Sequence, residues 1–233
     1  MFFDIDTIAS SQLRCDALEI IQTGLEAVAP RTLFMNNVHF NNGILSVGEE
    51  SIDVEGKIYV VGAGKSVGLM AEEFERIVGV EHIGGGIVNC TTTNYQTQKI
   101  KINKGAHPYP DQGGVNGVHE MLALKERMQK GDVIVCLLSA GGSALLAKPA
   151  GNITLKDESW LMEQFFAYGV STSEINIVRK HISDVKGGQL SRHFEPYKLM
   201  SIIISNIPRG DDSLVSSGPT IEPKTTYSDA YEI

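Results

Sequence analysis

A run of apolar residues in the middle of the chain ends in serines and glycines that could hold an anion. Residues 132–138 are apolar except for Asp132, and Ser139-Ala-Gly-Gly-Ser143 follows directly. The apolar run predicts a parallel strand buried on both faces, and the small residues predict a turn into a helix. Backbone N–H groups left bare at such a turn favour anionic ligands. The alternative is a tight turn whose glycines serve backbone geometry alone.

A second glycine loop follows the apolar residues 57–61. Gly62-Ala-Gly-Lys-Ser-Val-Gly68 precedes a segment with one apolar face, so the order is strand, glycine turn and helix. The spacing G-x-G-x-x-x-G is one residue longer than the dinucleotide fingerprint, and a P-loop would need glycine where Tyr59 stands. The loop and Lys65 can still hold a phosphate. A purely structural turn is an equal alternative.

A third group of polar side chains lies on a predicted helix within residues 171–181, which begins at Thr172 or Ser173. Asn176, Arg179 and Lys180 are three to four positions apart and therefore share one helix face. An amide, a guanidinium and an ammonium on one face suit a carboxylate or phosphate ligand. A solvated helix face is the alternative, and taken alone this pattern favours it.

Two adjacent carboxylates follow the apolar residues 198–205. Asp211 and Asp212 end the loop that begins at Asn206, and paired carboxylates of this kind are ligands for Mg²⁺. A further turn of small residues comes at Ser216-Ser-Gly-Pro-Thr220. These residues extend the set of polar turns that follow predicted strands.

The loop Gly105-Ala-His-Pro-Tyr-Pro-Asp111 offers a histidine and a carboxylate after a charged, alternating segment at 99–102. The alternation predicts an edge strand. His107 and Asp111 either line a pocket or belong to a rigid connector made by the two prolines.

The elements that must position these residues alternate along the chain. Strands are predicted at 57–61, 85–90, 132–138 and 198–205, with helices between them. This pattern predicts an α/β fold with a doubly wound, mostly parallel sheet and helices on both faces, a Rossmann-like three-layer sandwich. The polar loops then meet at the carboxyl ends of the strands. An amphipathic helix over residues 11–28 is expected to pack on the core.

Composition restricts the classes of partner. The chain has 233 residues, enough for a substantial core, and its formal net charge of −8 argues against nucleic-acid binding. No apolar run is long enough for a membrane span, and the amino-terminal residues lack the features of a signal peptide. Three cysteines without CxxC spacing indicate reduced thiols, with Cys90 and Cys136 buried. We expect a cytoplasmic protein that interacts with neither membranes nor nucleic acids.

Several motifs together resemble the amino-terminal domain of the glycerate 2-kinase family (class II, also called the MOFRL family). In chain order they are Val60-Val-Gly-Ala-Gly-Lys65, His107-Pro-Tyr-Pro-Asp111, Leu138-Ser-Ala-Gly-Gly-Ser-Ala-Leu145, Glu174-Ile-Asn-Ile-Val-Arg-Lys-His181, Lys186-Gly-Gly-Gln-Leu190, and Gly210-Asp-Asp212 with Ser217-Gly-Pro-Thr220. The resemblance covers nearly the whole chain. It implies phosphorylation of D-glycerate to 2-phosphoglycerate with ATP and Mg²⁺ or another divalent cation.

The resemblance also implies an architecture and a set of roles. Residues 1–233 would form a single Rossmann-like amino-terminal domain, with residues 1–30 as an amphipathic helix packed on it. The family's site lies in a cleft toward a smaller carboxy-terminal domain that this chain lacks, so association with such a domain or a homo-oligomer is expected. Lys65, Arg179 and Asp211 would be catalytic; Gly64, Ser139, Gly141, Gly142, Ser143, Ser217 and Gly218 would hold the nucleotide; Lys65, Asn176 and Arg179 would bind glycerate; Asp211 and Asp212 would bind the metal.

Two positions depart from the family's pattern. Ala140 replaces the first glycine of the serine–glycine turn, which would crowd a phosphate if that residue needs a positive φ. Asn206 stands where the family has an aspartate, and one residue is inserted after it, which weakens the metal site.

Two other functions remain open. The first is a hydroxypyruvate reductase with a nicotinamide cofactor, suggested by the Gly62-x-Gly64 pair and an older family label. Against it, the next strand ends in Asn89 and Cys90 instead of the acid that a dinucleotide ribose requires. The second is a truncated, non-catalytic binding or regulatory module.

Overall fold

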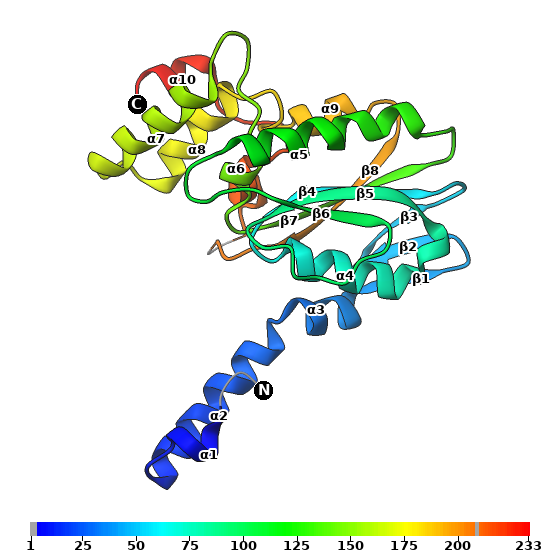
Figure 1. Cartoon of the computed structure of the whole chain (residues 1–233), viewed down its shortest axis with the longest axis vertical. Helices are drawn as coiled ribbons and strands as arrows, with labels where there is room; N and C mark the ends of the chain where they lie inside the picture. The colour runs from blue at the N-terminus through cyan, green and yellow to red at the C-terminus, as the bar shows by residue number, and fades with distance from the viewer. Residues whose placement is uncertain (1–3, 208–209) are drawn as a thin grey trace.

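A five-stranded parallel sheet forms the centre of the molecule (Figure 1). The computed structural model describes residues 4–207 and 210–233. The strands are β4 (Ile58–Ala63), β5 (Ile83–Cys90), β6 (Ile100–Lys104), β7 (Val133–Ser139) and β8 (Lys198–Ile204), in the order β6-β5-β4-β7-β8. Every neighbouring pair is parallel. The four predicted sheet strands are therefore confirmed, and so is the edge strand expected after residue 99.

Helices cover both faces of this sheet, as predicted, with α4 on one face and α5 and α9 on the other (Figure 1). The helices are α1 (Ile5–Ile8), α2 (Gln12–Ala27), α3 (Pro30–Asn37), α4 (Val67–Val78), α5 (Gln112–Ala123), α6 (Gly142–Leu145), α7 (Leu155–Ala167), α8 (Thr172–His181), α9 (Gln189–His193) and α10 (Tyr227–Tyr231), with 3₁₀ turns η1 (Val80–His82), η2 (Leu124–Arg127) and η3 (Asp212–Ser217).

The chain reverses direction across the sheet next to β4. From β4 it passes through α4 to β5 and then to the edge strand β6, and it returns through α5 to β7 on the other side of β4. This reversal is a topological switch point, where the loops after the two central strands run to opposite faces and leave a crevice. A ligand site is therefore expected in the crevice beside the loops that follow Ala63 and Ser139.

The two central strands hold the scaffold together. Every residue of β4 and β7 is buried. One apolar cluster on one face includes Phe74 of α4, and a second on the other face includes Met121 of α5. Burial of side chains this large contributes on the order of 2 kcal/mol each, so the loops leaving these strands start from fixed points.

Strand β8 differs from its sequence-based description. Its apolar composition predicts a buried strand, but only Ile202 is buried. It is the outer strand of the sheet, and among the described residues no strand pairs with its free side. An apolar run indicates a strand, but it does not say whether the strand lies inside or at the edge of the sheet.

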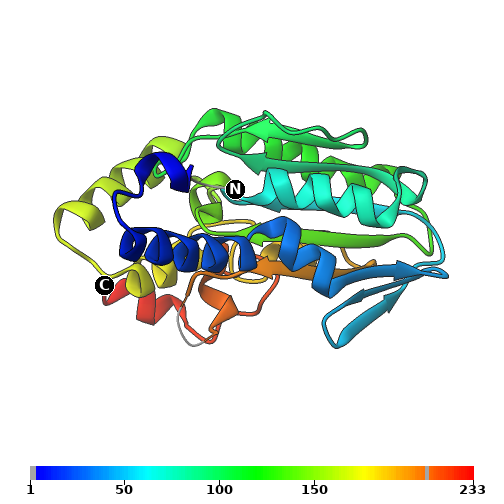
Figure 2. The ribbon, with the colours of Figure 1, turned by 90° about the horizontal axis from the view of Figure 1, so that it is seen from below.

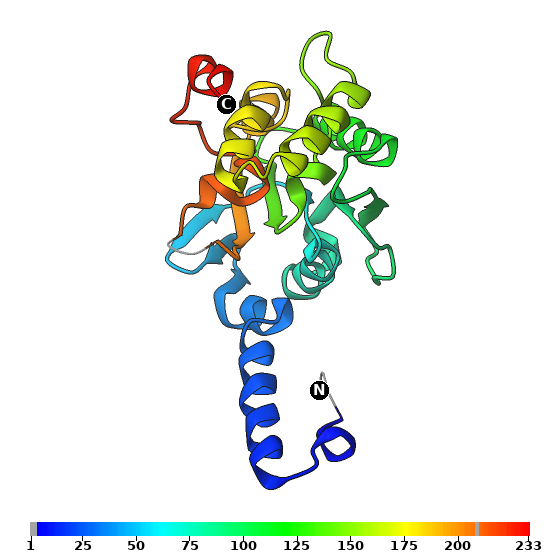
Figure 3. The ribbon, with the colours of Figure 1, turned by 90° about the vertical axis from the view of Figure 1, so that its left-hand side faces the viewer.

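The amino-terminal helix also differs from expectation. Its extent is confirmed by α2, with Ser11 as N-cap, but no residue of α2 is buried, and Leu13 and Ile20 are 79% and 73% exposed. It extends away from the sheet and its covering helices (Figures 1 and 3). The expected packing of residues 1–30 on the core is therefore wrong for the described part of that segment, and residues 1–3 lie outside it. An amphipathic pattern shows that a face needs a partner without identifying the partner.

A small antiparallel sheet connects α3 to the main sheet. It consists of β1 (Val38–Asn41), β2 (Ile44–Val47) and β3 (Glu50–Asp53), in that order (Figure 2). Along the described chain, no helix combines the length and the apolar character that a bilayer crossing requires.

Candidate functional site

A cavity of about 310 Å³ lies beside the carboxyl ends of the two central strands. Its walls come from the loops after β4, β6, β7 and β8, together with α6, α7, α8 and η3. The lining residues are Lys65, His107, Pro108, Ala140, Gly141, Ser143, Ala144, Phe166, Thr172, Asn176, Arg179, Asn206, Ile207, Leu214, Val215 and Ser216. The cavity therefore lies at the topological switch point, and six of the predicted loop and helix segments contribute to it.

The first glycine loop places Lys65 but does not cradle an anion with its own amides. A side chain on Gly62 would collide with the Leu137 carbonyl, and one on Gly64 with Ser139, so these glycines allow the loop to approach β7. The N–H of Gly64 donates to the Asn89 carbonyl (3.1 Å) and that of Lys65 to the Ala140 carbonyl (2.8 Å). The expectation that Gly64 holds a nucleotide through its N–H is therefore wrong. The exposed side chain of Lys65 is what this loop contributes to the cavity.

The serine–glycine turn brings three parts of the cavity together. Gly141 has φ +87°, and a Cβ there would lie 3.0 Å from both Lys65 Cε and His107 Cδ2. Gly142 begins α6, and a side chain on it would collide with Ser216. Because the first N–H groups of a helix lack intrahelical partners, those of Gly142 and Ser143 are available to a ligand.

Two residues of the same turn behave differently from expectation. Ser139 is buried, does not line the cavity, and its Oγ accepts from the N–H of Ser66 at 3.1 Å, so it joins the two glycine loops and is not free to hold a nucleotide. Ala140 lines the cavity and is not among the residues with positive φ. The backbone conformation there does not require glycine, so the expected crowding does not arise from φ.

Helix α8 divides its three predicted polar residues between two sides. Asn176 and Arg179 line the cavity, but Lys180 points to the neighbouring η3, where its Nζ lies 3.3 Å from Ser213 Oγ. Adjacent helical positions are about 100° apart, so Arg179 and Lys180 reach different surfaces. The helix is capped by Ser171, which accepts from the N–H of Glu174 in a capping box, one position before the predicted start.

A buried ion pair between Lys186 and Glu158 lies close to Arg179. Lys186 Nζ lies 3.2 Å from Glu158 Oε1 and donates to the Leu146 carbonyl at 2.9 Å, and the side chains of both charged residues are at most 2% exposed. Arg179 Nε donates to Met162 Sδ at 3.0 Å. Burial lowers the pKa of Arg179, while the Glu158 carboxylate opposes that shift.

The sequence analysis missed this pair. Lys186 lies in a Gly-rich segment that predicts only a helix start, and a lysine is rarely buried. A weak signal existed in Glu158, which is four positions before Met162 and therefore lies on the inner face of α7.

A chain of hydroxyl and amide groups runs behind Ser143. Its Oγ lies 2.8 Å from Ser217 Oγ, which in turn lies 2.8 Å from Asn176 Oδ1. The Asn176 amide nitrogen donates to the Leu214 carbonyl at 3.2 Å. Ser217 is fully buried and Gly218 closes η3 with φ +55°, and neither lines the cavity. These two predicted nucleotide contacts therefore act on the cavity only through their neighbours.

The cavity carries positive charge without a matching carboxylate. Among the described lining residues, Lys65 and Arg179 are cationic and none is Asp or Glu. Neither cation forms an ion pair with a described residue. The pKa of His107 is lowered by burial and by the nearby charges of Lys65 and Arg179. In a chain of net charge −8, this is a local site for an anion.

The loop before α5 fulfils both roles predicted for it, because it lines the cavity and also forms a rigid connector. His107 lines the cavity, whereas Asp111 is the N-cap of α5 and accepts from the N–H groups of Gly114 (2.8 Å) and Ala106 (3.0 Å). Asp111 thus belongs to a rigid connector, and it holds the histidine loop in place.

The paired aspartates lie outside the cavity. Asp211 and Asp212 line a separate hollow with Lys180 and Lys224, and Asp211 Oδ1 accepts from the N–H of Ser213 at 3.1 Å. Its pKa is lowered by the Ser213 hydrogen bonds and by the two lysines. Pro208 and Arg209 of the same loop lie outside the described residues. No group of three or more Asp, Glu, His or Cys side chains in the described part of the chain is placed to hold a metal ion.

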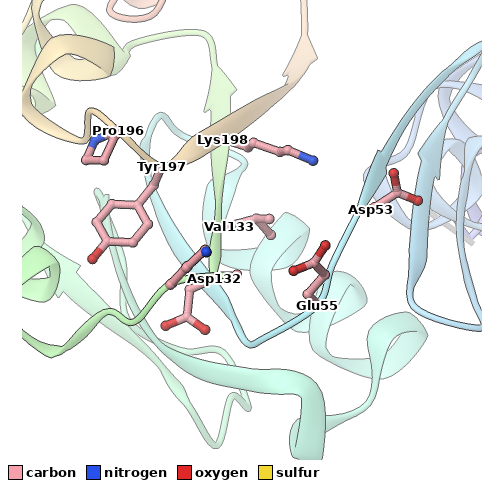
Figure 4. Close-up of a pocket in the computed structure, with 9 residues that line it drawn as sticks. Asp53, Glu55, Asp132, Val133, Pro196, Tyr197 and Lys198 are labelled. Carbon is pink, nitrogen blue, oxygen red and sulfur yellow. The ribbon is translucent and has the colours of Figure 1, made fainter.

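A second cavity, of about 360 Å³, lies at the opposite end of the sheet (Figure 4). It is lined by Asp53, Glu55, Lys130, Gly131, Asp132, Val133, Pro196, Tyr197 and Lys198. Asp132 is 7% exposed and accepts from the N–H groups of Lys57 and Gln129, both at 2.7 Å. Tyr197 donates to the Met128 carbonyl at 3.0 Å. These polar groups are engaged in fixing strand starts.

Known proteins resemble this chain over most of its length. Residues 16–233 match a family model described as "Domain of unknown function (DUF4147)". A glycerate 2-kinase from Pyrococcus horikoshii is 32% identical over 93% of this chain and 48% of its own length. A protein from Agrobacterium vitis with the provisional name hydroxypyruvate reductase is 36% identical over 76% of this chain and 41% of its own length.

Two crystal structures share the fold. One, of a Pyrococcus horikoshii protein, has a TM-score of 0.82 and 30% identity over 97% of this chain and 51% of the other. The second, glycerate kinase from Thermotoga maritima, has a TM-score of 0.77 and 26% identity over 93% of this chain and 50% of the other. The chain spans about half the length of the relatives it matches or less.

Proposed function

Because the chain belongs to the DUF4147 family, the amino-terminal domain of the MOFRL-family glycerate 2-kinases, we propose that it is the anion-binding half of an enzyme that phosphorylates D-glycerate with ATP. The product would be 2-phosphoglycerate. The names of the Pyrococcus and Thermotoga relatives support this activity. The whole reaction would need residues beyond this domain, since the relatives are about twice as long.

One observation carries the proposal. Lys65 and Arg179 come from elements more than a hundred residues apart, and both line a cavity at the switch point whose described walls contain no carboxylate. Lys65 is exposed and Arg179 is partly buried, and because the described walls hold no carboxylate, an anion that binds in the cavity relieves the repulsion between the two cations. ATP and glycerate are both anions.

The roles follow from what phosphoryl transfer requires. The protein must hold donor and acceptor in line and neutralise charge, and little covalent chemistry falls to its side chains. Lys65 and Arg179 would neutralise the transferring phosphoryl group or the glycerate carboxylate. The open N–H groups of Gly142 and Ser143 would bind a phosphate oxygen, and Asn176 would help to orient the acceptor.

A divalent cation fits this cavity poorly. Mg²⁺ is bound through one or two carboxylates together with phosphate oxygens and water. The two candidate carboxylates, Asp211 and Asp212, line a different hollow, and the described residues of that loop that line the cavity are Asn206 and Ile207. We assign the ion no step in the proposed reaction.

The name of the Agrobacterium relative favours a second function, reduction of hydroxypyruvate with a nicotinamide cofactor. The dinucleotide fingerprint needs free amides after β4 and an acid at the end of β5. The amides of Gly64 and Lys65 are engaged, and Asn89 at the end of β5 is buried and donates to the carbonyls of Gly114 and Leu145. We therefore retain the kinase as the proposed function.

We also infer a reducing, cytoplasmic location. Cys90 and Cys136 are free and buried, and burial raises the pKa of Cys136 to about 12. Such thiols are unreactive packing residues, as expected where disulfides are not needed.

Two assays run in parallel test the function. ADP release with ATP and D-glycerate is compared with loss of nicotinamide absorbance with hydroxypyruvate, and nucleotide binding is measured by calorimetry in case the domain does not turn over alone. Arg179→Met should lower ATP affinity by about tenfold or more, since a hydrogen bond to a charged group contributes about 1.5–3 kcal/mol.

Lys180→Met is the matched control, because it removes a cation from the next position of the same helix. That lysine lines the hollow that contains Asp211 and Asp212, not the cavity. The variant should leave ATP affinity nearly unchanged. Equal losses for the two variants, or nicotinamide-dependent turnover, would count against the proposed function.

A further inference from the structure

Ser143 is a cavity residue whose hydroxyl is held by a hydrogen bond on the side away from the cavity. It lines the cavity, and its Oγ lies 2.8 Å from Ser217 Oγ. Ser217 is fully buried, so its single proton and its lone pairs must be satisfied inside the protein. Which of the two serines donates decides what Ser143 can offer a ligand.

The direction of the bond follows from the next two links. The Leu214 carbonyl can only accept, so the Asn176 atom facing it at 3.2 Å is the amide nitrogen. The Asn176 oxygen, Oδ1, therefore faces Ser217 at 2.8 Å, and it too can only accept. Ser217 must give its proton to Asn176. The proton between the two serines then belongs to Ser143.

We propose that Ser143 presents only lone pairs to the cavity and accepts a hydrogen bond from an alcohol hydroxyl of the ligand. A deprotonated phosphate oxygen, such as those within the polyphosphate chain of ATP, carries negative charge and no proton, so it would meet those lone pairs unfavourably. This reverses the expected role of the Ser143 side chain as a phosphate cradle, while its backbone N–H keeps that role.

The inference rests on the proposed function for the cavity and specifies the class of ligand. Lys65 and Arg179 attract an anionic group, and Ser143 selects a molecule that also carries a hydroxyl donor. A hydroxy acid has both groups, as glycerate does. Ser143 is thus a specificity-determining residue that contacts the substrate hydroxyl.

The test uses three probes that separate the two groups. D-glycerate carries a carboxylate and hydroxyls, propanoate carries the carboxylate alone, and inorganic sulfate is a tetrahedral anion with no proton to donate near neutral pH. Their affinities for the full chain are measured by NMR titration, which tolerates weak binding. Ser143→Ala should weaken D-glycerate binding about fivefold, the loss of one hydrogen bond, and leave the affinities for propanoate and sulfate within about twofold.

Ser201→Ala is the matched control. Ser201 Oγ lies 2.7 Å from Thr220 Oγ1, so this variant also breaks a hydroxyl pair, but outside the cavity. It should leave all three affinities unchanged. Urea unfolding of both variants shows whether either is damaged in its fold.

Ser217→Ala gives a second, opposite prediction. Without Ser217 the Ser143 proton is free to turn into the cavity, so sulfate should bind more tightly relative to D-glycerate than in the wild type. If Ser143→Ala weakens sulfate binding as much as D-glycerate binding, the assignment of the lone pairs is overturned. If no probe binds the wild-type chain, the cavity is not the ligand site, and both the proposed function and this inference fail.

Discussion

At the amino ends of the central strands the sheet carries a cavity lined by Asp132 and Tyr197, and at their carboxyl ends a cavity of similar size lined by Lys65 and Arg179. In the first, Asp132 accepts from nearby backbone, Tyr197 donates to it, and the lining includes charged residues of both signs. In the second, the described lining includes two cations and no carboxylate. The volumes do not distinguish a binding site from a structural hollow. The balance of the lining charges does.

Two buried carboxylates, Asp132 and Glu158, also differ between the two ends of the sheet. Asp132 at the amino end is satisfied by two backbone N–H groups, which are present in any sequence that folds this way. Glu158 behind the carboxyl-end cavity depends on one ammonium, Lys186, and its Oε2 has no hydrogen-bond partner among the described residues. Hydrogen bonds from backbone N–H groups to Asp132 stabilise the fold. The Lys186–Glu158 pair next to Arg179 leaves one carboxylate oxygen without a hydrogen bond, and stability alone does not explain such a pair.

Breaking the pair should have the largest effect on stability. Lys186→Met leaves Glu158 buried and unpaired, and the free energy of unfolding should fall by about 3–5 kcal/mol in urea denaturation. Lys101→Met, which breaks the half-exposed pair between Lys101 and Glu120, should cost about 1 kcal/mol or less. Comparable losses of unfolding free energy in the two variants would show that the buried pair contributes no more to stability than the half-exposed one.

At the amino end, the expected effect is smaller and confined to stability. Asp132→Ala leaves the N–H groups of Lys57 and Gln129 without acceptors, which should lower the free energy of unfolding by about 2 kcal/mol. Phosphate affinity, measured on the same protein, should not change. A loss of anion binding would show that the two ends are coupled and not independent.

At the carboxyl end, one added methyl group should disturb binding more than folding. Gly141→Ala places a Cβ against Lys65 and His107 at a residue with φ +87°, where alanine costs about 1 kcal/mol. Phosphate affinity should fall several-fold because Lys65 is displaced. Gly151→Ala is the control, since φ there is also positive and nothing lies within 4 Å. A similar affinity loss in the control would point to general damage.

The smallest expected effect is a proton linked to binding. Burial and the charges of Lys65 and Arg179 hold the pKa of His107 below its ordinary 6.5. A bound anion offsets those charges and raises that pKa, so binding takes up a proton, and the affinity for sulfate, which does not itself titrate in this range, should increase as pH falls below about 6.5. The imidazole is followed by NMR with and without sulfate. An unchanged pKa, or a pH dependence that survives in His107→Gln, would contradict this coupling.

The sequence allowed the sheet to be predicted because the central strands are uniformly apolar and end in glycine loops. Lys65 and the serine–glycine turn could be predicted to meet because the carboxyl ends of parallel strands share one edge, whereas Arg179 was expected beside them only from the family resemblance. The site predictions that were wrong depended on the rotation of a side chain about its helix or on the contacts of one neighbouring residue. Lys180 points away because it lies one position beyond Arg179, and Gly64 turned out to serve the contact between strands. The same pattern of spacing fits either role.

Burial of polar residues could not be predicted in the same way. Lys186 and Ser217 are enclosed by segments that are distant in the chain, and nothing in their own sequence neighbourhood indicates it. Nor could the partner of α2 be predicted, since the pattern only shows that one face is apolar. The aspartates line another hollow, although the residues before them (Asn206 and Ile207) and after them (Leu214 to Ser216) line the cavity.

The most direct test of the account is to map phosphate binding along the whole chain by backbone amide NMR shifts. We predict saturable shifts centred on Gly141, Gly142 and Ser143, with none at Gly131 to Val133 in the opposite cavity, and loss of those shifts in Arg179→Met. Shifts centred on the amino-end cavity, or a response in Arg179→Met that equals that of the wild type, would contradict it.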